Sequence, residues 1–199
     1  HQYSLEYPYD VKDEWQLGRP IPEAQGPNGA PPYAYSGRWV FGTDLDGTYP
    51  DAAQMELLSP LMQLTIPPAD STSTNYTTRF NLVFHEWLDL ADSNDIVRVE
   101  MIRPVTGSEI AKRISNPGKP IITLVPNRSS EQNTTGSWRR VIVPIEVSAN
   151  ETNIYFKFFF RSDASGNAGG WYLDDVAVIQ GGEINGTYTN GTNAQVVLL

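Results

Sequence analysis

Short apolar runs separated by turn residues recur along the chain from Arg38 onward. Gly, Pro, Asn and Asp fill the gaps between them, and these residues favour turns. Many short strands at such spacing are typical of an all-β sandwich. The nine predicted strands are RWVF, QMELL, LMQLTI, TRFNLVFHEWL, IVRVEMI, PIITLVP, WRRVIVPIEV, NIYFKFFFR and GWYLDDVAVI.

Alternation within two of these runs predicts which residues face the core, because successive side chains of a strand point to opposite faces. In NIYFKFFFR, the residues predicted to be buried are Ile154, Phe156, Phe158 and Phe160. The opposite face then carries Tyr155, Lys157, Phe159 and Arg161. In TRFNLVFHEWL, the same rule places Phe84 in the core and His85 outside it.

The segments on either side of the predicted strands have a different composition. Residues 1–36 are rich in Pro, Gly and Tyr and show neither a helical nor a strand period, which predicts an extended arm. Residues 37–180 form one predicted β-sandwich domain. Residues 181–199 are a Gly-, Thr- and Asn-rich linker followed by the apolar ending Val196, Val197, Leu198 and Leu199. A free apolar ending of this kind is prone to pair with a sheet edge.

The net charge of the chain indicates which classes of binding partner to expect. A formal net charge of -9 repels phosphate backbones and anionic lipids, so we expect neither nucleic acid nor a membrane as a partner. An acidic surface suits divalent cations instead. The absence of cysteine removes disulfides, thiolate metal sites and cysteine nucleophiles from consideration.

The Asn-x-Ser/Thr pattern is more frequent than the composition predicts, and it marks acceptor sites for N-linked glycans in exported proteins. We therefore expect a secreted or extracellular glycoprotein. The chain begins with His1 and has no apolar segment near 18 residues, so we expect a signal peptide to have been removed. The predicted glycosylation sites are Asn75, Asn127, Asn133, Asn150, Asn185 and Asn190.

Two stretches, FGTDLDGTYPDAAQMELLSPLMQL and SDASGNAGGWYLDDVAV, carry a family resemblance. They resemble the MAM-like jelly-roll modules attached to secreted peptidases of the immune inhibitor A type and to other microbial surface proteins. The shared pattern is a Gly-x-Tyr turn, a Leu-x-Ser-Pro strand, an aromatic strand with His or Trp, and a closing Gly-Trp-Tyr-x-Asp-Asp-Val strand. The resemblance covers about residues 38–180. It implies a jelly roll at an extracellular surface and an accessory role, and it implies no reaction.

Catalytic chemistry finds little support in the sequence. His1 and His85 are the two histidines, and the chain has no His-Glu-x-x-His helix and no Gly-x-Ser-x-Gly elbow. His85 and Glu86 are neighbours on a strand, so they point to opposite faces and do not act on one substrate atom. We therefore expect no enzyme and keep an independent hydrolase as a remote alternative.

An oxygen-rich loop, TDLDGTYPD, is a candidate structural calcium site. Calcium takes six to eight oxygen ligands, often from an Asp-rich loop that bends at glycine. The alternative is an Asp-Gly turn whose side chains cap backbone N–H groups. Asp163 and Asn167 form a second candidate. The predicted calcium ligands are Asp44, Asp46, Asp51, Glu56 and one or both of Asp174 and Asp175, which alternation puts on different sides of the sheet or at its rim.

Exposed aromatic residues could stack on sugar rings, which makes a carbohydrate-binding surface a further candidate. Trp171 and Trp138 lie within predicted strands, so we assign them to the core. The candidate glycan platforms are Trp15, Trp39 and Trp87. A lone aromatic side chain is more often a packing residue.

Two functions of different classes follow from these patterns. The first is a secreted, glycosylated structural protein that polymerises into an extracellular fibre or surface layer, with copies of itself as partners. In such a polymer, the apolar ending or the N-terminal arm adds a strand to a neighbouring subunit. A further possibility is that the apolar ending folds back on its own domain. The alternative is an accessory module of a larger secreted enzyme that binds carbohydrate or a surface, with surface polysaccharide as a candidate partner.

Overall fold

The computed structural model describes residues 15–21, 29–64, 77–103, 121–134, 136–148 and 153–181. These residues form ten β-strands and one short 3-10 helix. In chain order the elements are β1 (Gln16–Gly18), β2 (Val40–Gly42), β3 (Gln54–Leu58), β4 (Met62–Gln63), β5 (Thr77–Asp89), β6 (Ile96–Ile102), β7 (Ile121–Arg128), η2 (Ser130–Gln132), β8 (Arg139–Ser148), β9 (Asn153–Arg161) and β10 (Gly170–Gln180).

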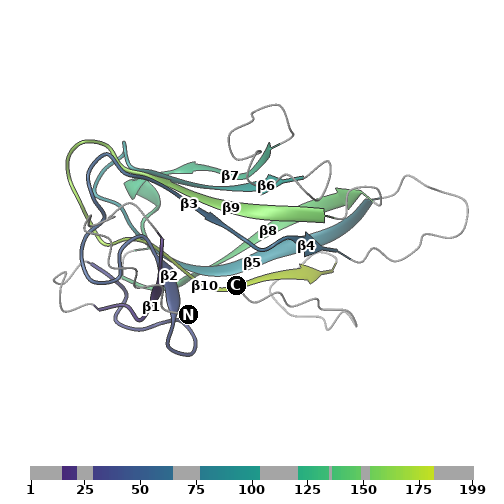
Figure 1. Ribbon diagram of the computed structural model, residues 1–199, viewed down its shortest axis with the longest axis horizontal. Helices are drawn as coiled ribbons and strands as arrows, with labels where there is room; N and C mark the ends of the chain where they lie inside the picture. The colour runs from purple at the N-terminus through teal and green to yellow at the C-terminus, as the bar shows by residue number, and fades with distance from the viewer. Residues whose placement is uncertain are drawn as a thin grey trace, which may run out of the picture.

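The strands form two antiparallel sheets packed face to face (Figure 1). Sheet A has the order β1-β2-β10-β5-β8, and sheet B has the order β3-β9-β6-β7 with β4 beside β9. Apart from β1 and β4, the first strand pairs with the last, the second with the second-last, and so on inward. This nested pairing, divided between two sheets, is the topology of a jelly roll, as the sequence predicted.

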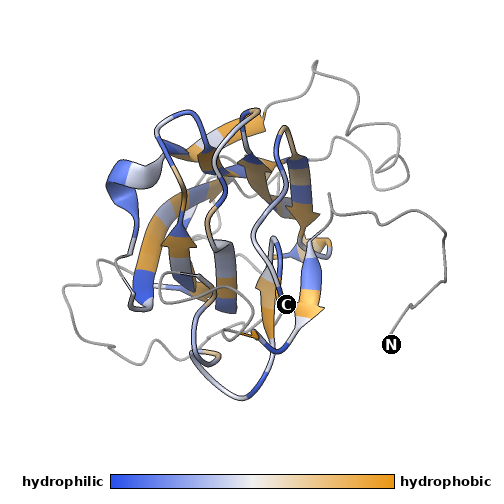
Figure 2. Ribbon diagram, turned by 90° about the vertical axis from the view of Figure 1, so that its left-hand side faces the viewer, coloured by the Kyte–Doolittle hydropathy of each residue, from blue (hydrophilic) through white to orange (hydrophobic). Residues whose placement is uncertain are grey.

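The core lies between the sheets and is built from the alternate residues that face inward. In Figure 2, hydrophobic positions recur on the strands of both layers. The alternation predicted for β9 is confirmed, since each of its four inward residues is 0% exposed. Phe84 is also fully buried, and its ring meets that of Phe158 from the opposite sheet at 5.4 Å between centroids.

The outer face of β9 is buried as well, which its alternation did not predict. The guanidinium of Arg98 lies 3.7 Å from the centroid of Phe159. Lys157 forms ion pairs with Glu56 at 3.1 Å and with Glu100 at 2.7 Å. Long charged side chains cover an aromatic ring in this way while they neutralise one another. The buried residues of this outer face are Tyr155, Lys157 and Phe159.

All nine predicted strands are present, and the additional strand β1 lies within the predicted N-terminal arm. β1 is three residues long and pairs with β2, with Leu17 opposite Phe41. Three residues are too few to show a strand period, so no periodic pattern marks β1 in the sequence. The sandwich therefore starts before residue 37, the boundary that composition suggested. Within the described residues, no helix has the length and apolarity needed to cross a bilayer.

Candidate functional site

The hydroxyl of Tyr49, the last residue of the Gly-x-Tyr turn, makes hydrogen bonds that stabilise the fold. This side chain is fully buried, and its hydroxyl donates to Asp95 at 2.5 Å and accepts from the backbone N–H of Ala91 at 2.8 Å. Burial and the neighbouring Asp95 carboxylate raise the pKa of Tyr49 above its usual range. The turn before β3 is thereby fastened to the loop between β5 and β6.

The other residues of the shared pattern also have structural partners. Ser59 accepts from the backbone N–H of Phe156 at 2.9 Å. Gly170 has φ +103°, and an added Cβ there would lie 2.1 Å from Oγ1 of Thr43. Tyr172 donates its hydroxyl hydrogen toward the carbonyl oxygens of Asp44 at 2.6 Å and Gly169 at 2.8 Å. The pattern thus specifies how the jelly roll closes.

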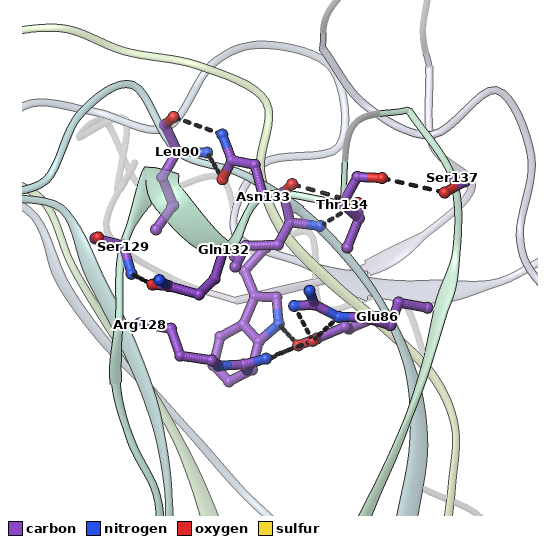
Figure 3. Close-up of polar contacts among 11 residues, drawn as sticks. Glu86, Leu90, Arg128, Ser129, Gln132, Asn133, Thr134 and Ser137 are labelled. Carbon is purple, nitrogen blue, oxygen red and sulfur yellow. Dashed lines mark hydrogen bonds and ion pairs between the residues drawn. The ribbon is translucent and has the colours of Figure 1, made fainter.

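A buried ion cluster lies between the two sheets, around Glu86 (Figure 3). Glu86 on β5 is 0% exposed and accepts from both Arg128 on β7 and Arg139 on β8. The indole N–H of Trp171 on β10 donates to the same carboxylate at 2.9 Å. Arg128 belongs to sheet B and the other three residues belong to sheet A, so this cluster fastens one sheet to the other.

The protonation of Glu86 follows from these contacts. Burial by itself would raise the pKa of the carboxyl, but the hydrogen bonds and charges of Arg128 and Arg139 outweigh it and hold the pKa below its ordinary value. Strand alternation predicted that Glu86 and His85 lie on opposite faces, and this prediction is confirmed. The cluster itself was not predicted, although a charged residue between Phe84 and Leu88 on an inward face signals a buried partner.

Beside this cluster, η2 and the residues after it hold the end of β5. Asn133 accepts from the backbone N–H of Leu90 and donates to the carbonyl of the same residue, both at 2.9 Å. Thr134 accepts from the backbone N–H of Leu88 at 3.1 Å. Figure 3 draws these side chains together with Glu86 and Arg128. These contacts hold residues 133 and 134 against the end of β5 and the residue that follows it.

The outer face of sheet A is covered at one end by residues 29–40, the covering segment. Its Ala30, Ala34 and Val40 pack with Trp87 and Tyr172 in a second apolar cluster, outside the main core. These residues belong largely to the predicted arm, so part of that arm is a packed element of the domain.

Three aromatic contacts hold the covering segment in place. Tyr35 stacks on His85, with ring centroids 3.5 Å apart and planes at 11°. The indole N–H of Trp138 donates to the carbonyl of Tyr33 at 3.0 Å, and that of Trp87 donates to the carbonyl of Gly29 at 3.2 Å. His85 is half-buried by these neighbours, and burial lowers its pKa below the ordinary value of 6.5.

Asp174 and Asp175 fix the covering segment at Ser36. The backbone N–H of Ser36 donates to Asp174 at 2.9 Å, and its hydroxyl donates to Asp175 at 2.7 Å. Alternation placed the two carboxylates on different sides, and this expectation is wrong. A β-bulge shifts the register between Asp174 and Ala177, and Asp175 has φ 50°, so both carboxylates reach Ser36.

Although it is fixed, the covering segment exposes three large aromatic side chains. Tyr33 is 67% exposed, Tyr35 47% and Trp39 59%. Ser36, Asp174 and Asp175 supply hydroxyl and carboxylate groups next to Tyr35 in this part of the surface. These three exposed side chains lie within residues 33–39 of the covering segment, and together we call them the aromatic surface. Trp39 was predicted from the sequence, whereas the two tyrosines were not singled out.

The remaining candidate platforms are packing residues. Trp15 lies 5.5 Å from Trp171 between ring centroids and packs against the main core. Trp87 is 8% exposed and belongs to the cluster under the covering segment. Trp87 is too deeply buried for sugar stacking, and Trp15 is partly buried against the core. Their surroundings are set by chain segments distant in sequence, which the strand period does not report.

The predicted calcium ligands do not come together as a group. Asp44 accepts from the backbone N–H groups of Asp46 and Gly47, so it caps its own turn, as the alternative predicted. Glu56 forms its ion pair with Lys157, and Asp51 is exposed. In the described part of the chain, no three acidic or histidine side chains are placed to hold a metal ion. Calcium binding stays a prediction.

Asp163 and Asn167, the second calcium candidate, are tied into the loop before β10. Asp163 accepts from the backbone N–H of Ser165 at 2.9 Å, and the side-chain amide of Asn167 donates to the carbonyl of Tyr49. Both contacts stabilise the end of the sandwich next to Tyr49.

The glycosylation sites are only partly described. Asn127 is exposed on β7, and the amide of Asn133 is occupied by Leu90. Four acceptor sites lie outside the described residues: Asn75, Asn150, Asn185 and Asn190. The apolar ending, Val196, Val197, Leu198 and Leu199, lies outside them as well.

Comparison with known proteins gives one informative similarity. No family model matches the chain. Bacillopeptidase F of Bacillus subtilis (strain 168) is 30% identical to it over 168 residues, which is 84% of this chain. The same stretch is 9% of bacillopeptidase F, so the chain spans a small part of this relative.

Proposed function

We propose that this chain is a secreted, non-catalytic accessory module that binds an extracellular polysaccharide. The similarity to part of a secreted peptidase fits such a module. The separation of His85 and Glu86 onto opposite faces of β5 supports a role without catalysis. Secretion also agrees with the excess of predicted glycosylation sites.

The aromatic surface is the observation that carries this proposal. Exposing Tyr33, Tyr35 and Trp39 leaves apolar area in water, and a chain with no use for them would lose little by replacing them. The covering segment fixes Tyr35 on His85 before any ligand arrives, which reduces the entropy lost on binding. Exposed aromatic rings, of which that of Tyr35 is held in place, suit the flat apolar faces of hexose units.

The charge of the molecule indicates which sugars fit. With a net charge of -9, and with Asp174 and Asp175 beside Ser36, the surface disfavours uronic acids and phosphate-bearing glycans. Carboxylates and hydroxyls accept hydrogen bonds from sugar hydroxyls. The proposed ligand is therefore a neutral polysaccharide of hexose units.

A sedimentation assay with insoluble chitin and cellulose tests this function. We expect the wild-type chain to bind one of them, and Trp39→Ala combined with Tyr33→Ala to weaken binding about tenfold, which corresponds to roughly 1.4 kcal/mol. Ile121→Ala, which removes a 42% exposed side chain on sheet B, is the matched control and should bind normally. Failure of the wild-type chain to bind either polymer would contradict the proposal.

A self-assembling fibre or layer subunit is the second candidate function. It is favoured by the apolar ending, which suits addition to a sheet edge, and by a stretch of β10, described below, that has a strand partner on one side only among the described residues. Size-exclusion chromatography and electron microscopy of the full chain distinguish the two candidates. Filaments or large oligomers support assembly, whereas a monodisperse 22.1 kDa monomer contradicts it.

A further inference from the structure

The outer edges of both sheets are poor places for another strand to pair. β1 is three residues long, and β3 is followed directly by Ser59 and Pro60. β7 carries Pro126 in a bulge between its pairs with Val97 and Val99. β8 carries Pro144 opposite Asn81. Proline offers no N–H to an incoming strand, and short or bulged edges resist pairing.

One edge inside sheet A differs from these. β2 pairs with β10 only at Tyr172 and Leu173, whereas β5 pairs with β10 as far as Gln180. Among the described residues, β10 from Val176 to Gln180 has a strand partner on the β5 side alone. Val176 and Val178 on this stretch are 3% and 1% exposed and belong to the main core. The stretch VAVIQ contains no proline and no charge.

We propose that residues 194–199, the apolar ending AQVVLL, dock on this β10 edge of their own chain and complete sheet A. A strand at this position continues the sheet on the side of the main core, so it must supply apolar residues there. AQVVLL is apolar at every position except Gln195 and is rich in strand-forming residues. It also removes the unpaired N–H and C=O groups that make an open edge prone to aggregate.

The linker between β10 and the apolar ending explains why docking within the same chain is favoured over docking on a neighbouring copy. Residues 182–193 join Gly181, the residue after β10, to the apolar ending. Twelve residues of a Gly-rich chain span about 20 Å on average, enough to return along a strand of five residues. Such a tether gives an effective concentration in the millimolar range, far above a micromolar concentration of free copies. This inference is independent of the proposed polysaccharide binding.

A competing occupant is the segment just after β10, residues 183–187 with the sequence EINGT. A tight hairpin through Gly181 and Gly182 would bring it to the same edge. This segment contains Asn and Gly, which strands disfavour, and Asn185 is a predicted glycan site that would have to face solvent. The apolar ending therefore fits the edge better.

Cysteine cross-linking tests the docking directly, because the natural chain has no cysteine. Ala177→Cys on β10 is combined in turn with Val196→Cys, Val197→Cys and Leu198→Cys, so that neighbouring registers are sampled. After mild oxidation, we expect a monomer with an internal disulfide, seen as a reduction-sensitive shift in gel mobility. One register should exceed the control by about tenfold because the edge holds the segment in place. The control pairs Leu61→Cys, beside β4, with the same tail positions.

Three results would overturn the inference. Disulfide yields equal to the Leu61 control mean that the ending is not held at this edge. Disulfide-linked dimers or ladders at micromolar concentration mean that a second copy occupies the edge. Cross-linking of Ala177→Cys with Ile184→Cys in place of the tail positions assigns the edge to residues 183–187.

Hydrogen exchange provides a second measurement that needs no cysteine. A chain ending at residue 193 should stay folded, because the main core is otherwise intact. We expect the backbone N–H groups of β10 that point away from β5 to exchange faster in this truncated chain, while amides of β6 in sheet B keep their protection. Unchanged exchange along Val176–Gln180 contradicts the docking.

Discussion

Glu86 links the two sheets through its carboxylate, which contacts Arg128 of sheet B and Arg139 and Trp171 of sheet A. Its carboxylate is the shared acceptor for two arginines and one indole, and it is buried where an unpaired charge costs several kcal/mol. Neutralising it would leave Arg128 and Arg139 without their counter-charge. The loss of stability on neutralising Glu86 should therefore exceed the loss on removing any exposed ion pair.

Replacing Glu86 with Gln should lower the free energy of unfolding by about 3 kcal/mol, because removing one partner of a buried pair leaves the other uncompensated. The matched control is Glu146→Gln, which removes the exposed Arg79–Glu146 pair, whose side chains are 67% and 61% exposed. Such exposed pairs contribute about 0–1 kcal/mol. Urea unfolding of both variants measures the difference, and equal effects would show that the cluster adds no stability.

The pH dependence of the same pair of proteins checks the charge of Glu86. Its pKa in the folded chain lies below the ordinary value of 4.5. The ionised carboxylate therefore stabilises the wild-type chain fully above about pH 4.5, and this contribution is lost as the pH falls toward the folded pKa. The stability difference between wild type and Glu86→Gln should shrink in that acidic window. A constant difference would indicate a loss of packing alone.

At the scale of elements, the covering segment shows how a stretch without a period becomes ordered. Its residues are fixed by side chains of the strands beneath: His85 stacks on Tyr35, and Asp174 and Asp175 bind Ser36. None of these contacts is local in sequence. The order of the segment therefore depends on sheet A, and so does the exposure of the aromatic surface.

Protonation of His85 should weaken this element. Burial lowers the pKa of His85 below 6.5, and the charge of Arg140 lowers it further, whereas Asp175 acts in the opposite direction. The folded chain then accepts a proton less readily than the unfolded chain, so stability is kept above about pH 6.5 and lost as the pH falls below it. His85→Gln should remove this component of the pH dependence.

The measurement is the melting temperature of both proteins between about pH 8 and pH 5, where histidine titrates. We expect the wild-type melting temperature to fall more steeply than that of His85→Gln on the acidic side of this range. Parallel curves for the two proteins would contradict the assigned role of His85. Tyr35→Ala, which removes the ring stacked on His85, should bring the wild-type curve closer to that of the variant.

At the scale of the whole molecule, a jelly roll carries acidic charge and predicted glycans on its surface. Asn127 is exposed on the edge strand β7, where an attached glycan would also hinder edge pairing. Glycosylation and the prolines of β7 and β8 would then both protect the molecule against pairing of its sheet edges with other chains. This protection agrees with an accessory module that stays monomeric.

Intact mass spectrometry of this chain, after secretion from a host that attaches N-linked glycans, tests the predicted glycosylation sites. We expect masses above the bare 22.1 kDa, in steps of whole glycans, which treatment with an amidase specific for N-linked glycans reduces. In the glycopeptides, Asn127 should be more occupied than Asn133, whose amide is engaged with Leu90. A mass equal to the bare chain would remove the main sequence argument for export.

The sequence by itself determined the fold of this protein to a large extent. Period-two alternation in β9 identified the four inward residues, and turn residues marked nine of the ten described strands, because both signals are local in the chain. The motif around Gly170, Trp171 and Tyr172 pointed to the jelly roll. The physical reason is that burial selects apolar residues at every second position of a strand with one face in the core.

Only the tertiary structure decided which residues come together in the candidate sites and which side chains stay exposed. The local sequence does not distinguish Trp15, Trp39 and Trp87. In the structure, Trp15 and Trp87 pack against distant segments, whereas Trp39 stays exposed. The β-bulge in β10 turned Asp174 and Asp175 to the same partner, which alternation cannot report. Glu86, Arg128 and Arg139 came together from three strands. Exposure and charge pairing depend on contacts between residues far apart in the chain, so these properties appear only once the sheets have packed.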